Sequence, residues 1–300
     1  MEKGLIFMVF AAVSFALAGV LVRKGAAQTG ESFTSTAISI FLGLPFFAVA
    51  LCITGEWSLL NSISERDFIL FGLAGILHFV AGRALIFNGF RIIGSNKANP
   101  LVNTNIFYTV ILGILFLNEP LNLLLIPGVL CIFTGAVLIS TEKKSVAVEE
   151  KKGLLGTEIK GILSTLSGAI CWGLSAIVVR MGIGEAGSPY VGAFISYVAA
   201  SIVEAMFFLR RQHREQLFQL PFSKVLVTIV ISGFLMSIGQ LLRYTALSYS
   251  PASLVAPIAS TGALFTIIFS FLINRQIEVF TPRIIIGIMA TVVGTFLLFQ

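Results

Sequence analysis

Long apolar runs alternate with short polar segments along this chain, and ten of the runs are long enough to cross a lipid bilayer. A membrane-spanning helix needs about 20 apolar residues, whereas a membrane β-strand alternates apolar and polar positions. Because the runs show no such alternation, the pattern predicts an all-α polytopic membrane protein. The ten predicted transmembrane helices are Gly4–Arg23, Phe33–Ile53, Phe68–Phe90, Ala98–Leu117, Leu121–Ile139, Gly161–Met181, Tyr190–Leu209, Val225–Ala246, Ala252–Ile273 and Arg283–Phe299.

A polar segment in the middle of the chain separates the spans into two groups of five. Residues 140–160 contain five Lys and four Glu and few apolar side chains. This composition is typical of a solvated, flexible linker. We therefore predict a first five-helix repeat at residues 1–140, a charged linker at 141–160 and a second five-helix repeat at 161–300.

The two groups match each other at a constant spacing in the sequence. A shift of 157 residues places Pro100 on Pro257 (257 − 100 = 157) and Thr104 on Thr261. A constant shift over a long stretch indicates an internal duplication. Because each copy has an odd number of spans, the copies are expected to cross the membrane in opposite directions, as inverted repeats. The same shift pairs Leu17 with Leu174, Gly82 with Gly239 and Thr109 with Thr266, and a shift of 159 pairs Glu119 with Glu278.

The composition agrees with a membrane protein and gives its orientation. Hydrophobic residues make up 57% of the chain and charged residues 11%, with a mean hydropathy of +0.98, whereas soluble domains carry about 25% charged residues. The net charge of +6 is spread over loops, which does not indicate a nucleic-acid surface. Loops after odd-numbered spans hold fifteen of the twenty Lys and Arg, so the positive-inside rule places these loops in the cytoplasm and both termini outside. The fifteen are Arg23, Lys24, Arg91, Lys97, Lys143, Lys144, Lys151, Lys152, Lys160, Arg210, Arg211, Arg214, Lys224, Arg275 and Arg283.

Several short segments resemble the drug/metabolite transporter superfamily, and within it the EamA-like ten-span transporters. The first span of each half ends in an Arg after small residues, in SFALAGVLVRKG and CWGLSAIVVRMG. The fourth span of each half contains a Pro, and its first copy ends in LFLNEPL, whereas the second copy departs from this pattern with INRQIE. The fifth spans carry paired glycines, Gly128 with Gly135 and Gly287 with Gly294.

This resemblance implies a secondary carrier for a small metabolite, such as an amino acid or a related polar compound, often moved outwards. It also implies that the first, third and fourth spans of each half surround a central cavity, with the fifth spans packed behind it. Glu119, before Pro120 at the end of the fourth span, we interpret as a structural residue that caps or pairs at a helix end.

Two arginines inside predicted spans are the main candidates for substrate binding. A charge in mid-span costs roughly 2.5–3.5 kcal/mol on insertion scales, so Arg83 and Arg243 are expected to face a cavity or a partner. The repeat shift aligns Arg83 with Gln240, which places the two arginines about one helical turn apart in equivalent spans. Their guanidinium forks suit a carboxylate or phosphate. The alternatives are that they cap backbone carbonyls or pair with Glu204.

Neutral polar and aromatic residues complete the predicted substrate-binding set. Asn99 and Asn103 share a helical face in the fourth span, and Ser260 is the repeat equivalent of Asn103. Hydrogen bonds between helices are the alternative role for such amides, and plain packing is the alternative for the aromatics. The set is Asn88, Asn99, Asn103, Trp172, Tyr244 and Ser260.

Two titratable residues in spans are candidates for proton coupling. His78 lies near the middle of the third span and changes charge near neutral pH when unperturbed. Glu204 lies inside the seventh span, where carboxylates serve proton relays. The alternatives are a buried histidine with satisfied hydrogen bonds and a glutamate that extends towards the membrane surface.

These patterns predict a secondary active transporter, an exporter or exchanger of a small polar metabolite such as an amino acid or organic anion, that works by alternating access. A passive facilitator or channel, or a flippase for a lipid carrier, is the alternative. We expect no enzyme, because the single Asp, Asp67, cannot form an aspartyl pair and no H-E-x-x-H zinc motif occurs.

The expected partners follow from the same patterns. They are the substrate, the lipid bilayer of the cell membrane and protons as the coupling ion, with no nucleic acid. No nucleotide-binding G-x-x-x-x-G-K-[ST] motif occurs, and we expect neither a cofactor nor a metal. The chain is expected to work as a monomer or a homodimer.

Overall fold

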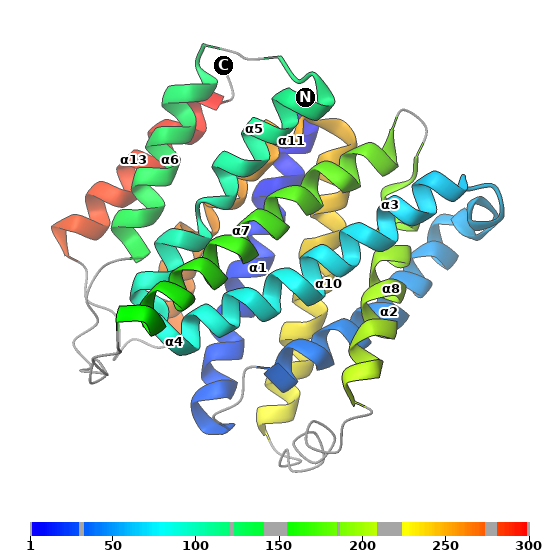
Figure 1. Cartoon of the computed structure of the whole chain (residues 1–300), viewed down its shortest axis with the longest axis horizontal. Coiled ribbons are helices and arrows are strands. Elements are labelled where there is room, and N and C mark those ends of the chain that lie inside the picture. Colours follow the sequence, from blue (N-terminus) through cyan, green and yellow to red (C-terminus); the bar gives the residue numbers. More distant parts are fainter. Residues whose placement is uncertain are drawn as a thin grey trace.

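The computed structural model describes residues 2–29, 33–120, 123–140, 155–184, 187–208, 224–273 and 281–298, and their secondary structure is helical throughout (Figure 1). Six helices are long and apolar enough to cross a membrane, and four shorter apolar helices accompany them. Six plus four gives ten, and each overlaps one predicted span, which confirms the polytopic all-α fold.

The described helices lie in two groups, on either side of residues 141–154 in the sequence. The first comprises α1 (Glu2–Thr29), α2 (Phe33–Thr54), the short 3₁₀-helix η1 (Glu56–Asn61), α3 (Glu65–Gly75), the π-helical turn η2 (Ile76–Gly82), α4 (Arg83–Val102), α5 (Asn105–Leu117) and α6 (Leu125–Ser140). The second comprises α7 (Leu155–Ile183), α8 (Pro189–Phe208), α10 (Lys224–Tyr249), α11 (Ala252–Ala259), α12 (Gly262–Ile273) and α13 (Pro282–Leu298). Because α7 begins at Leu155, the last residues of the predicted linker are helical.

The third and fourth spans of the first half differ from the prediction. We expected a loop between Phe90 and Ala98, but helix runs without interruption from the start of α3 to the end of α4. In the second half the equivalent chain does break, at Pro251, between α10 and α11. The residue before a proline avoids the helical region, and Gly94 stands at the position equivalent to Pro251 in the first half.

A second break occurs at equivalent places in both halves. Turns at Asn103–Thr104 and Ser260–Thr261 separate α4 from α5 and α11 from α12, 157 residues apart (260 − 103 = 157). The hydroxyl of Thr104 donates to the carbonyl of the residue three before it at 2.6 Å, and Thr261 does the same at 2.7 Å. The repeat shift therefore holds at the level of single hydrogen bonds. The breaks come three residues after the paired prolines and not at them.

Helix packing repeats with the two halves exchanged. α1 packs on α10 as α7 packs on α4, α2 on α10 as α8 on α3, and α1 on α12 as α7 on α5. Such reciprocal pairs are expected of two copies related by a pseudo-twofold axis, which for inverted repeats lies in the membrane plane. The amino end of α1 and the carboxyl end of α13 lie at the same edge (Figure 1), as an even number of spans requires.

The fifth spans of the two halves, α6 and α13, pack together at one side of the molecule (Figure 1). Their glycines allow this close approach, because a Cβ on Gly294 would lie 2.7 Å from the carbonyl oxygen of Gly128. Small residues at helix contacts in lipid let two backbones come close. The fifth spans thus pack on each other, which the resemblance, placing them behind the cavity, did not specify.

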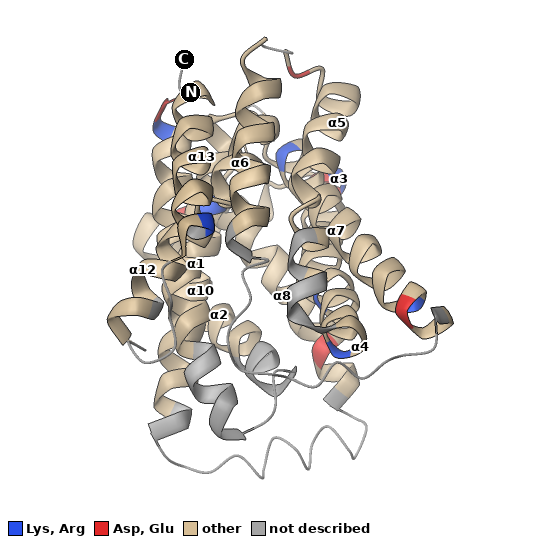
Figure 2. Cartoon of the chain, turned by 90° about the vertical axis from the view of Figure 1, so that its left-hand side faces the viewer, with Lys and Arg blue, Asp and Glu red and all other residues tan. Residues whose placement is uncertain are grey.

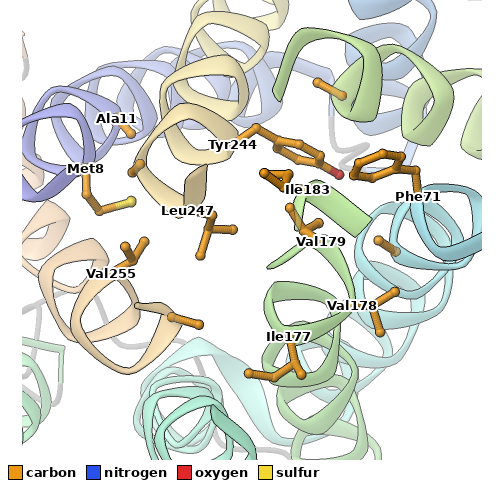
Figure 3. Packing of buried hydrophobic residues seen from close by; sticks show 14 of the residues in the cluster. Met8, Ala11, Phe71, Ile177, Val178, Val179, Ile183, Tyr244, Leu247 and Val255 are labelled. Atoms are coloured by element: carbon orange, nitrogen blue, oxygen red, sulfur yellow. The ribbon is translucent and has the colours of Figure 1, made fainter. Parts of the chain in front are cut away.

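The hydrophobic core lies where the halves meet. Met8 of α1, Phe71 of α3, Val179 of α7 and Tyr244 of α10 are almost fully buried there (Figure 3). Many large apolar side chains stay exposed on the outside, such as Ile53 with 80% of its surface accessible. Long stretches of helix carry no charged residue (Figure 2). This distribution fits a protein whose outer surface faces lipid.

Candidate functional site

A polar cluster surrounds the imidazole of His78 in the π-helical turn η2. His78 Nδ1 lies 3.1 Å from Ser175 Oγ of α7, and its Nε2 lies 3.1 Å from Gln240 Nε2 of α10. Arg243 of α10 donates to Gln240 Oε1 and to Ser175 Oγ, each at 3.4 Å. The central cluster comprises His78, Arg83, Trp172, Ser175, Gln240 and Arg243.

The direction of each hydrogen bond in this chain follows from the donors available. The Ser175 hydroxyl donates its one proton to the carbonyl oxygen of Trp172, at 2.7 Å. Its oxygen therefore accepts from His78 Nδ1–H. The Nε2 atom of His78 then carries a lone pair and accepts from the Gln240 amide N–H, whose oxygen accepts from Arg243. The chain is complete with a neutral imidazole that holds its proton on Nδ1.

Trp172 of α7 fixes the position of the imidazole. The two rings stack with 5.3 Å between their centroids and 22° between their planes. The indole N–H donates to the backbone oxygen of His78 at 3.1 Å. The glycine at the end of η2 makes room for this indole, because a Cβ on Gly82 would lie 2.4 Å from its Cδ1 atom, too close for any real contact. A π-helical turn inside a longer helix is often found at functional sites.

Arg83, the first residue of α4, directly follows η2 and lies in the same half as His78. Its guanidinium donates to Ser39 Oγ of α2 at 3.4 Å and lies 5.3 Å from the ring centroid of Phe79. Tyr197 and Glu204 of α8 lie within its electrostatic reach.

The two arginines act on the same side chains. Arg83 and Arg243 both interact electrostatically with His78 and with Tyr197. Each guanidinium has several N–H donors, but their hydrogen bonds to described residues are three in all, each 3.4 Å long. Both side chains are half-buried. The remaining donors can therefore hold an anion.

A buried pair on α8 has unused polar atoms. Glu204 and Ser201 lie one helical turn apart and are 3% and 6% exposed. Glu204 Oε2 and Ser201 Oγ have no hydrogen-bond partner among the described residues. The predicted alternative of an Arg83–Glu204 pair is thus not formed through this carboxylate oxygen.

Among the other predicted residues whose side chains are described, Asn88 and Tyr244 bond residues outside the central cluster. Asn88 donates to Ser164 Oγ of α7 at 3.1 Å, which is the interhelical role given above as its alternative. Tyr244 is 1% exposed, and its hydroxyl donates to Ser196 Oγ at 2.8 Å, so it packs in the core (Figure 3). Asn103 and Ser260 are half-buried at the equivalent helix breaks. The side chain of Asn99 lies outside the described residues.

Three members of this region are not among the residues that the sequence pattern indicated. Ser175, Gln240 and Tyr197 are uncharged side chains inside apolar runs. One signal was available for Gln240, because the repeat shift aligns it with Arg83. No comparable signal pointed to Ser175 or Tyr197, which are recognisable only from their contacts.

Glu119 and Arg180 hold the break between α10 and α11. The Glu119 carboxylate accepts from the backbone N–H groups of Ala252 at 2.7 Å and Ser253 at 2.9 Å, which caps the amino end of α11. Arg180 donates to the carbonyl oxygen of Leu247 at 2.7 Å, near the carboxyl end of α10. The interpretation of Glu119 as a structural cap is confirmed, although it caps a helix of the other half. A pocket of about 500 Å³ lies beside this junction.

Two groups of spans that pack reciprocally, each with an arginine inside an equivalent span, define a polytopic membrane protein built from two repeats. The sequence model of the EamA-like transporter family matches residues 2–141 and 159–300, and the chain belongs to this family. The protein is therefore a multi-pass integral membrane protein of the cell membrane, and its family is one of EamA-like transporters. The resemblance drawn from the sequence is confirmed.

Individual relatives agree with this assignment. An uncharacterized transporter from Methanothermobacter thermautotrophicus is 22% identical over 71% of this chain and 60% of its own length. An uncharacterized transporter in the cobO 3'region of Sinorhizobium sp is 30% identical over 42% of this chain and 87% of its own length. A crystal structure of a protein superposes with a TM-score of 0.77 at 15% identity, covering 97% of this chain and 94% of the other. That similarity shows the fold alone.

Proposed function

We propose that this protein is a secondary active transporter, an exporter or exchanger, for a small anionic or zwitterionic metabolite such as an amino acid or organic anion. The observation that carries the proposal is that Arg83 and Arg243, from equivalent spans of the two halves, both lie within electrostatic range of His78 and Tyr197, with Arg243 bonded to the two partners of His78. Carboxylate or phosphate oxygens are the natural ligands of such a pair. The site residues in this proposal are Arg83, Arg243 and Trp172.

The lack, among the described residues, of negative charge bonded to the two arginines supports an anion as the ligand. Mid-span cations are costly in a membrane unless they have a counter-charge or water. The carboxylate of Glu204 acts electrostatically on Arg83, yet its Oε2 atom bonds neither arginine. A bound anion supplies the missing acceptors of both guanidinium groups at once. Since the arginines come from different halves, the anion also links the two parts that move.

Alternating access follows from the repeat architecture. In inverted-repeat carriers, one bundle rocks against the other around a site near the midplane. The reciprocal pairs α1 with α10 and α7 with α4 are the elements that would slide. We assign the repeats to residues 1–140 and 161–300, joined by the linker 141–160. His78 and Glu204 are the two proposed proton carriers.

Thermal shift with purified protein in nanodiscs tests the ligand class. The panel is glutamate, glycine, citrate, inorganic phosphate and glucose 6-phosphate, with sucrose and spermidine as uncharged and cationic controls. A ligand at 100 times its Kd stabilises by about 2.7 kcal/mol. We expect an anion or zwitterion to shift the wild type, and Arg83→Gln and Arg243→Gln to lose the shift. Arg66→Gln, which alters an exposed arginine of α3, is the matched control that keeps it.

Counterflow in proteoliposomes separates the carrier from the alternatives. A carrier loaded with unlabelled ligand accumulates labelled ligand transiently, and its flux saturates. A channel or passive pore shows linear flux without counterflow, and a flippase moves a lipid probe and none of the panel. Shifts of equal size in the wild type and both arginine variants would contradict the assignment of the arginines.

A further inference from the structure

We propose that His78 is a proton switch that releases Arg243 to the anion, through rotation of the Gln240 amide. The proposal rests on the proposed function and names its coupling ion and the residues that couple it. It selects His78 over Glu204 as the proton carrier. The anion and one proton then cross the membrane together.

In the observed arrangement Arg243 donates hydrogen bonds within the central cluster. Gln240 uses its amide nitrogen on His78 Nε2 at 3.1 Å, which turns its oxygen towards Arg243 at 3.4 Å. The Ser175 hydroxyl proton is committed to the Trp172 carbonyl at 2.7 Å. The neutral imidazole of His78 therefore sets the orientation of the Gln240 amide. The amide oxygen in turn accepts a hydrogen bond from Arg243 Nη1.

Protonation of His78 reverses the orientation of the Gln240 amide. A proton from water binds the lone pair of His78 Nε2, and no bond other than this N–H forms or breaks. The new Nε2–H needs an acceptor, and a protonated imidazole has donors only. Rotation of the Gln240 side-chain amide brings Oε1 to Nε2–H and places its NH₂ group opposite Arg243. Two donors then face each other, so Arg243 loses the Gln240 acceptor, keeps its bond to Ser175 Oγ, and has Nη1 free to bind an anion.

The charges around the cluster link the proton to the anion. The charged groups that act on His78 are Arg243 of α10 and Arg83 of α4. From α8, Tyr197 and Glu204 act on Arg83, and the groups that α7 places on the imidazole, Trp172 and Ser175, do not titrate. An imidazolium would be a third cation beside two others, and a bound anion is the counter-charge that permits it. Binding of each therefore favours binding of the other.

Nitrogen NMR of ¹⁵N-histidine-labelled protein in nanodiscs reads this switch directly. The chain has two His, so a spectrum contains two residues, and His213→Gln leaves His78 alone. Ring shifts distinguish the two neutral tautomers from the imidazolium. At pH 7.5 without ligand we expect the Nδ1–H neutral form. An Nε2–H tautomer or an imidazolium under these conditions would overturn the switch, whether or not any anion binds.

Addition of anions tests the coupling. We expect those panel anions that raise thermal stability at pH 6.5 to convert His78 to the imidazolium. Their affinity should also fall as the pH rises, up to tenfold per pH unit for one coupled proton. His78→Asn should bind the anion without this pH dependence, while Glu204→Gln keeps it. An anion that stabilises the protein while leaving His78 neutral, or an unchanged pH dependence in His78→Asn, would overturn the coupling.

The two proposals fail in different ways. If no panel anion stabilises the wild type, the proposed function fails. The His78 tautomer measured without ligand still tests whether the hydrogen bonds of the switch are present. If anions bind and His78 stays neutral, the function stands and the switch fails.

Discussion

Glu119 offers the most direct test of how the two halves are joined. Its carboxylate accepts two backbone N–H groups of α11, from Ala252 and Ser253, at 2.7 and 2.9 Å. These residues are 0% and 2% exposed, so the substitution Glu119→Ala leaves two buried N–H groups without their protein acceptor. The first half would then lose its cap on a helix of the second half.

The size of the effect follows from the two donors. Each buried N–H left without a partner costs about 1–3 kcal/mol, which gives roughly 2–6 kcal/mol for two. Loss of a negative charge at the amino end of a helix adds about 0.3–1 kcal/mol. We therefore expect Glu119→Ala to destabilise the protein by about 2–7 kcal/mol, a fall in Tm on the order of 4–20 °C.

Thermal unfolding in nanodiscs, followed by intrinsic fluorescence and circular dichroism, measures this loss. Glu119→Gln keeps one acceptor oxygen and should lose about half as much. The matched control is Glu65→Gln, which removes an exposed carboxylate from the first turn of α3 and should change stability by less than about 0.5 kcal/mol. A Tm for Glu119→Ala within about 1 °C of the wild type would refute the cap as a source of stability.

Two further predictions concern the cluster and the orientation. Trp172→Phe keeps the ring stack but leaves the His78 carbonyl without its 3.1 Å donor, which should cost about 1 kcal/mol in thermal unfolding; an unchanged Tm would show that this bond is dispensable. With Cys52, Cys131 and Cys171 replaced by Ala, an impermeant maleimide should label Ser62→Cys in intact cells and Ser145→Cys only after lysis, and the reverse pattern would invert the predicted topology.

The sequence by itself determined the number of spans and their grouping. Hydropathy is a local property, since each span must be apolar over its own length to enter lipid. The repeat shift is also readable from residue identities, and it paired Asn103 with Ser260, although it did not predict that the helices break at these positions. A charge in an apolar run is conspicuous for the same reason, which is why Arg83, Arg243 and His78 could be selected before any contact was known.

Tertiary structure decided which polar side chains meet. The partners of His78, Ser175 and Gln240, lie 97 and 162 residues away along the chain, and no periodic pattern encodes contacts at such separations. Glu119 likewise caps a helix 133 residues further on. Tyr244 and Asn88 have the polar groups expected of cavity residues. In the structure Tyr244 packs in the core and bonds Ser196, and Asn88 bonds Ser164 of α7. Burial and direction are set by neighbouring helices, so chemical type alone could not assign them.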